Sequence, residues 1–107
     1  MRVLLDNCVP WQLMRSLAGH TVESVIKLGW ADLLDGEPLP LVEGHLDALL
    51  TVDKSIPFQQ NLSKYSFGVI VMRARSNRLH DLIQLAPEVL TALQSLAPGT
   101  AVVVGRV

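Results

Sequence analysis

Two acidic residues, Asp6 and Asp53, each stand directly after or at the end of a short apolar run. The runs, Arg2–Leu5 and Ala48–Val52, have the composition of buried β-strands. If these strands are neighbours in a parallel sheet, they lie about 4.8 Å apart and bring both carboxylates to one edge. Two carboxylates at that spacing can share a divalent cation, and without one they repel each other until one takes up a proton. The alternative is that both acids only cap the strand ends.

A basic cluster follows another apolar run, Phe67–Met72. Arg73, Arg75 and Arg78 supply three of the nine basic residues within six positions. Guanidinium groups bind phosphate bidentately, so Arg73 and Arg75, with Asn77 beside them, are candidates for holding a substrate phosphate. The alternatives are a solvated loop, or ion pairs that neutralise the two aspartates in place of a metal.

Further polar residues are candidates for the lining of the same cleft. The amides of Gln59, Gln60 and Asn61 can hydrogen-bond bases or water there; equally, they can cap a turn. Cys8 stands close to Asp6, and we interpret it as a small buried residue at a helix start rather than a redox or metal-binding group.

The candidate site residues can meet only if the secondary structure brings the ends of several strands to one place. Short apolar runs predict strands at Arg2–Leu5, Ala48–Val52, Phe67–Met72 and Ala101–Val104, and Thr21–Val25 is also predicted to be a short strand. Helical spacing predicts one helix from Pro10 to Gly19, and another that is capped by Ser76 or Asn77 and kinks or restarts at Pro87. Apolar strands separated by helices predict an α/β fold with a mostly parallel sheet of four or five strands, covered on both faces. In such sheets ligands bind beyond the carboxyl ends of the strands, at the topological switch point.

Length and composition limit the class of protein. The 107 residues, 50% hydrophobic and 18% charged, predict a single folded domain over residues 1–107. A net charge of −1 gives no general attraction to nucleic acid, so any such partner needs a local basic patch. One cysteine excludes an internal disulfide, and no apolar run approaches the roughly 20 residues of a membrane span. The first apolar run is too short for a signal peptide, so we expect a cytoplasmic protein with no membrane partner.

Two stretches, residues 4–10 (LLDNCVP) and 49–54 (LLTVDK), resemble a bacterial family of small PIN-like domains. That family is usually described as a domain of unknown function and in some members as a toxin. One of its subgroups shares four more stretches, GWA at 29–31, GE at 36–37, FQQNL at 58–62 and ARSNRL at 74–79. Together and in this order they cover most of the chain, from Arg2 to about Leu93.

The resemblance implies a PIN-like three-layer α/β/α sandwich in which acidic residues hold Mg²⁺ or Mn²⁺. It also implies a metal-dependent ribonuclease with an RNA substrate, acting as the toxin of a toxin–antitoxin pair with an antitoxin protein as partner. Asp6 matches the first-strand acid and Asp53 the acid after the threonine. Glu37 matches the acid in the preceding loop, with Asp35 as the alternative third acid. Carboxylates are hard oxygen ligands that suit Mg²⁺.

Two positions depart from the family pattern. Asn7 stands where many relatives carry Glu, and Ser55 stands where others carry Asp or Asn. The alternative hypothesis is therefore a catalytically inactive PIN-like binding module that acts through a partner protein or a homodimer. Apolar surface around Trp30, Leu33 and Leu34 would supply the contact.

Overall fold

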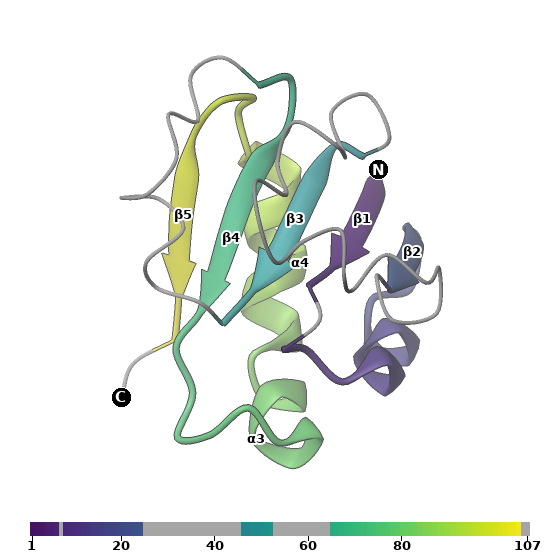
Figure 1. Cartoon of the computed structure of the whole chain (residues 1–107), viewed down its shortest axis with the longest axis vertical. Helices are drawn as coiled ribbons and strands as arrows, with labels where there is room; N and C mark the ends of the chain where they lie inside the picture. Colours follow the sequence, from purple (N-terminus) through teal and green to yellow (C-terminus); the bar gives the residue numbers. More distant parts are fainter. Residues whose placement is uncertain (7, 25–45, 53–64, 106–107) are drawn as a thin grey trace.

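Five short segments form one β-sheet in the computed structural model of this chain, which describes residues 1–6, 8–24, 46–52 and 65–105 (Figure 1). The strands are β1 Arg2–Leu5, β2 Thr21–Ser24, β3 Ala48–Thr51, β4 Gly68–Met72 and β5 Ala101–Val104. The five predicted strands are confirmed, and their ends agree to within one residue.

All neighbouring strands are parallel, and their order across the sheet is β2-β1-β3-β4-β5. β1 therefore lies between β2 and β3, with Leu5 opposite Leu50. This is a doubly wound order, in which the strand sequence reverses direction between β1 and β3. The first and third strands are thus neighbours, which was the condition for bringing their carboxyl ends together.

The first helix, η1 at Trp11–Ser16, is a 3₁₀ helix that begins directly after Pro10. It is shorter than the predicted helix. The Leu17 amide donates to the Met14 carbonyl at 3.2 Å, which is the tight spacing that short helices adopt. Gly19 then turns the chain toward β2 with a φ of 90°, a conformation that glycine adopts without strain.

The second helical segment is divided into α3, Leu79–Ile83, and α4, Ala86–Ser95. The break predicted at Pro87 is present, and Pro87 lies in the first turn of α4, where a missing N–H costs little. The predicted cap is wrong, because the N-cap residue of α3 is Arg78. Ser76 instead lies before the helix, where its hydroxyl accepts the Arg78 N–H at 3.1 Å and donates to Asp81 at 2.6 Å.

Both faces of the sheet are buried, as predicted for an α/β sandwich. η1, α3 and α4 pack on one face, and Figure 1 shows α4 crossing behind the strands. The core on that face includes Leu5, Leu13, Leu17, Leu50, Ile70, Met72, Leu82, Val89 and Leu93. A second cluster on the opposite face contains Leu4, Leu46, Leu49, Phe67, Val69 and Val71. No helix in the described ranges is long and apolar enough to cross a membrane.

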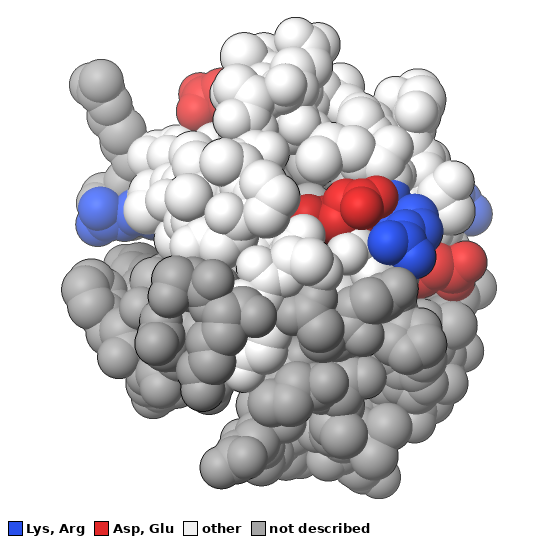
Figure 2. All heavy atoms as spheres, turned by 90° about the horizontal axis from the view of Figure 1, so that it is seen from above, with Lys and Arg blue, Asp and Glu red and all other residues white. Residues whose placement is uncertain are grey.

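Arg2 and Asp47 form an ion pair at the amino-terminal edge of the sheet, 3.5 Å apart. The Arg2 backbone N–H donates to the Asp47 carboxylate at 2.8 Å, which lowers the pKa of that carboxyl. Figure 2 looks onto this edge, and its described surface is mostly uncharged, without a broad basic patch.

Candidate functional site

Asp6 lies at the carboxyl end of β1, beside the point where the strand order reverses. Its backbone N–H donates to the Leu50 carbonyl at 2.9 Å, so the pairing with β3 continues one residue beyond β1. Because side chains alternate along a strand, Asp6 lies on the same face of the sheet as Leu4. Asp6 is 7% exposed and is one of the few buried charged residues in the described part of the chain.

The side chain that β3 brings to Asp6 is Thr51. The pairing of Leu5 with Leu50 places Thr51 opposite Asp6, and the Thr51 hydroxyl donates to Oδ2 of Asp6 at 2.7 Å. Thr51 is fully buried. Sequence reasoning did not assign a role to this threonine, although it is the one polar residue within an apolar run.

Cys8 completes the cluster. Its Sγ lies 3.6 Å from Oδ2 of Asp6 and 3.6 Å from Oγ1 of Thr51. Burial raises the pKa of the Cys8 thiol and the negative charge of Asp6 raises it further, against the opposing hydrogen bonds of the Val52 backbone and Thr51. A neutral thiol is a weak nucleophile, which agrees with the interpretation of Cys8 as a packing residue.

The other predicted acids fall outside the residues that the structure describes. These are Asp53 and Glu37, together with the alternative Asp35. Also outside the described ranges are the amides Gln59, Gln60 and Asn61 and the apolar residues Trp30, Leu33 and Leu34. Within the described ranges, no three side chains of His, Cys, Asp or Glu are grouped closely enough to hold a metal ion. The metal site predicted from the sequence thus has one described acid, Asp6.

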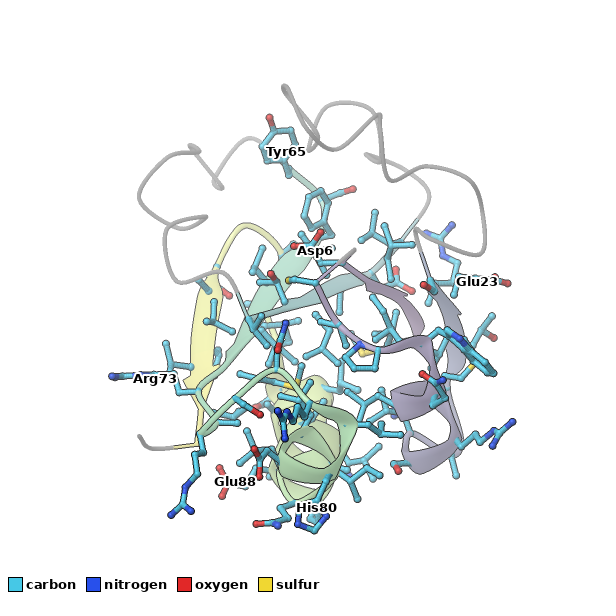
Figure 3. The ribbon with its side chains drawn as sticks, turned by 60° about the horizontal axis from the view of Figure 1, so that its bottom comes forward. Asp6, Glu23, Tyr65, Arg73, His80 and Glu88 are labelled. Atoms are coloured by element: carbon cyan, nitrogen blue, oxygen red, sulfur yellow. The ribbon has the colours of Figure 1, made fainter. Side chains whose placement is uncertain are left out.

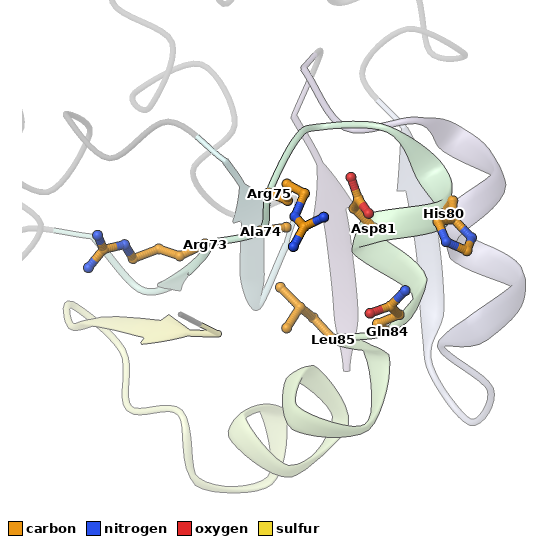
Figure 4. Close-up of a pocket in the computed structure, with 7 residues that line it drawn as sticks. All are labelled: Arg73, Ala74, Arg75, His80, Asp81, Gln84 and Leu85. Carbon is orange, nitrogen blue, oxygen red and sulfur yellow. The ribbon is translucent and has the colours of Figure 1, made fainter. Parts of the chain in front are cut away.

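The two predicted phosphate-binding arginines follow β4. The Arg73 N–H donates to the Val104 carbonyl at 2.8 Å, so both arginines start from the carboxyl end of the sheet, as expected. Their side chains point in different directions. Figure 4 shows Arg75 turned toward α3 and Arg73 turned away from it. Figure 3 shows Arg73 projecting outward, away from Asp6. Asn77 is exposed in the loop before α3.

The Arg73 side chain carries an unusual feature. Its Nε is buried and has no hydrogen-bond partner among the described residues. A buried charged donor without a partner is costly, so this atom favours an anionic acceptor nearby. The sequence places an arginine here but contains no sign of this burial.

The Asp6–Thr51–Cys8 cluster offers a carboxylate and a hydroxyl at the position where doubly wound sheets bind their ligands. Both are hard oxygen groups that can bind a cation, and the carboxylate can also accept a proton from a water molecule. Comparison with protein-family models, with curated proteins and with solved structures finds no match to this chain. The chemistry of the site is therefore inferred from its own residues.

Proposed function

We propose that this chain is a PIN-like ribonuclease that depends on Mg²⁺ or Mn²⁺ and acts in the cytoplasm as the toxin of a toxin–antitoxin pair. The observation that carries the proposal is the buried Asp6 carboxylate at the switch point of the parallel sheet, held by the Thr51 hydroxyl at 2.7 Å. A carboxylate at this position lies where a ligand enters such a sheet. Burying a carboxylate is costly unless it is hydrogen-bonded or binds a cation.

The donor chemistry of the cluster fits a hard divalent cation. Asp6 would hold the ion together with Asp53 and Glu37, as the resemblance to PIN-like proteins implies. When bound, such an ion supplies a water nucleophile and stabilises the leaving oxygen in phosphodiester hydrolysis.

The remaining residues of the site have positioning roles in this proposal. The Thr51 hydroxyl orients the Asp6 carboxylate, as hydrogen bonds to metal-ligating groups do in metalloenzymes. The neutral Cys8 thiol donates a weak hydrogen bond to the same oxygen and adds no charge of its own. Arg73 and Arg75, with Asn77, Gln60 and Asn61, would hold the RNA strand, because guanidinium groups bind phosphate bidentately.

The test is cleavage of single-stranded RNA in the presence of Mn²⁺. The wild-type chain should cleave, and Asp6→Asn should be slower by about 100-fold or more, the upper range for disturbing a metal site. Asp47→Asn is the matched control, because it removes one carboxylate charge at the opposite edge of the sheet. It should cleave like the wild type.

A binding measurement separates metal binding from catalysis. Calorimetry should detect Mn²⁺ binding to the wild type and to Asp47→Asn, and a loss of that binding in Asp6→Asn. Cleavage that is equal in the wild type and Asp6→Asn would contradict the assignment of Asp6. A wild-type chain that neither cleaves RNA nor binds Mn²⁺ would contradict the nuclease proposal.

A second candidate is a catalytically inactive PIN-like module that binds a partner protein or forms a homodimer. It is favoured by β5, an edge strand whose Val103 is 55% exposed. Beside Val103 lies a groove of about 390 Å³ between β5 and α4, lined in part by Pro87, Ala92 and Val104. Edge strands commonly carry charged residues that prevent pairing, whereas β5 consists of alanine and valine.

Light scattering of the purified chain tests this candidate. A dimer that Val103→Lys converts to a monomer, in a chain without cleavage activity, would support it. A monomeric wild-type chain that cleaves RNA would contradict it.

A further inference from the structure

A pocket of about 380 Å³ lies where the chain leaves β4 and enters α3 (Figure 4). Its volume falls within the usual range for small-molecule sites. Its polar lining residues are Arg73, Arg75, His80, Asp81 and Gln84, and its apolar ones are Ala74 and Leu85. None of these seven residues belongs to the Asp6–Thr51–Cys8 cluster.

Opposite charges face this pocket without pairing. In Figure 4 the Arg75 guanidinium and the Asp81 carboxylate both point toward the space between β4 and α3. Among the described residues, Arg75 has no ion pair or hydrogen bond, whereas Oδ2 of Asp81 accepts the Ser76 hydroxyl at 2.6 Å. Ser76 also accepts the Arg78 N–H, so the hydroxyl that donates to Asp81 is itself held by the loop backbone. The Asp81 carboxylate, a fixed acceptor, therefore faces the Arg75 guanidinium, a donor without a hydrogen-bond partner among the described residues.

We infer that this pocket binds a guanine base. A ligand that bridges the two groups must offer acceptors to Arg75 and N–H donors to Asp81 from adjacent edges of one rigid ring. Guanine has acceptors at O6 and N7, the preferred partners of arginine, and donors at N1 and N2. A free phosphate offers acceptors alone and is repelled by Asp81.

The rest of the lining fits the same ligand. Leu85 and Ala74 present apolar surface on which a flat ring can lie, and the Gln84 amide offers a further donor and acceptor. Proteins that recognise single-stranded RNA read splayed-out bases in this way, by their edges and by contact with their faces. The inference rests on the proposed ribonuclease function and deepens it: the substrate would be RNA with an unpaired guanine near the scissile bond.

Titration of the metal-free chain with mononucleotides, followed by amide NMR shifts, tests the pocket without any need for cleavage. GMP should give saturable shifts at Ala74, Arg75 and Asp81. AMP and CMP carry the same phosphate and should bind at least about tenfold more weakly, since a bidentate base contact commonly contributes that much discrimination. Ribose 5-phosphate, which lacks a base, should give no saturable shift at these amides.

Three variants locate the contacts. Asp81→Asn keeps an oxygen for Ser76 but turns part of the acceptor into a donor, and should weaken GMP binding by about tenfold. Arg75→Gln should have a similar effect, whereas Arg78→Gln removes the same charge from the same loop and should leave GMP binding within about twofold. The dispersion of each amide spectrum shows whether the variant is folded.

Several results would overturn the inference: equal binding of GMP and AMP, ribose 5-phosphate shifts at the same amides, or no saturable GMP shift at all. RNA cleavage without GMP binding would overturn the guanine pocket and leave the ribonuclease proposal standing. GMP binding without RNA cleavage would support the pocket and count against the ribonuclease.

Discussion

Asp6 and Thr51 depend on each other as a buried pair. The threonine is fully buried and the aspartate is 7% exposed, so each takes from the other a hydrogen bond that water would otherwise supply. Leaving a buried polar group without its partner costs more than the hydrogen bond itself contributes. The pair therefore has a stability signature that is independent of any catalytic role.

Replacing the hydroxyl with a methyl group tests this dependence. Thr51→Val preserves the shape of the side chain but removes the donor to Asp6, so the free energy of unfolding should fall by about 1–3 kcal/mol. Thr51→Ser keeps the hydroxyl, so its free energy of unfolding should fall by less. Urea denaturation measures both, and a Thr51→Val chain as stable as the wild type would contradict the importance of this bond.

Cys8 reports on the charge of Asp6. Since burial and the Asp6 carboxylate raise the pKa of the thiol, its thiolate fraction at pH 8 should be lower than in the unfolded chain. Alkylation by iodoacetamide should therefore be slower in the folded chain and should accelerate about tenfold per pH unit below the pKa.

Removing the Asp6 charge should shift this profile. Asp6→Asn lowers the pKa of Cys8, so alkylation at a given pH should be faster than in the wild type, with the rise displaced to lower pH. Asp47→Asn is remote from Cys8 and should leave the profile unchanged. Identical profiles for all three chains would show that Asp6 does not act on the thiol.

At the scale of elements, close packing of β4 against the end of α4 fixes the distance between sheet and helix. A Cβ placed on Gly68 would lie 2.5 Å from Cγ of Leu96, the residue that follows α4. That atom is near the backbone rather than at the tip of a flexible side chain, so it has little freedom to move away. Glycine is required at the start of β4 for this close approach.

Gly68→Ala should therefore destabilise the chain by about 1–3 kcal/mol, the usual effect of overpacking. Combining it with Leu96→Ala removes the clash, so the double variant should be less destabilised than the sum of the two single variants. Thermal or urea unfolding of the four chains measures this coupling. If the changes in the free energy of unfolding are strictly additive, the two residues are not in steric conflict.

The elements themselves were largely predictable from the sequence. Four of the five strands are predominantly apolar runs of four or five residues, and Pro87 places the helix break, because both signals are local. The exception is β2, which has one apolar residue, Val22. The 3₁₀ form of η1 and the late start of α3 were not predictable. Both depend on how Leu13 and Leu82 reach the common core, which local spacing does not encode.

At the scale of the whole molecule, the strand order places buried strands at the centre of the sheet and partly exposed strands at its edges. Every residue of β3 and β4 is buried. β2 and β5 each contain exposed residues, such as Glu23 and Val103. The functional candidates, Asp6 and Arg75, stand at the carboxyl ends of the inner strands β1 and β4, with the more stable part of the sheet behind them.

Amide hydrogen exchange should reproduce this order. Exchange should be slowest in β3 and β4, because their opening requires disruption of both core clusters, and faster in β2 and β5. Exchange followed by mass spectrometry of peptides resolves the strands. Greater protection in β5 than in β4 would contradict the edge position of β5, or indicate that a second chain covers it.

The sequence by itself determined the α/β class, the five strands and the placement of Asp6, Arg73 and Arg75 at strand ends, because periodicity and proline act over a few neighbouring residues. Only the tertiary structure decided which side chains meet. Thr51 reaches Asp6 across 45 positions through the register of β1 and β3, and the two arginines diverge although one residue separates them. The physical reason is that strand register and side-chain direction are set by packing between distant segments, which no local pattern specifies.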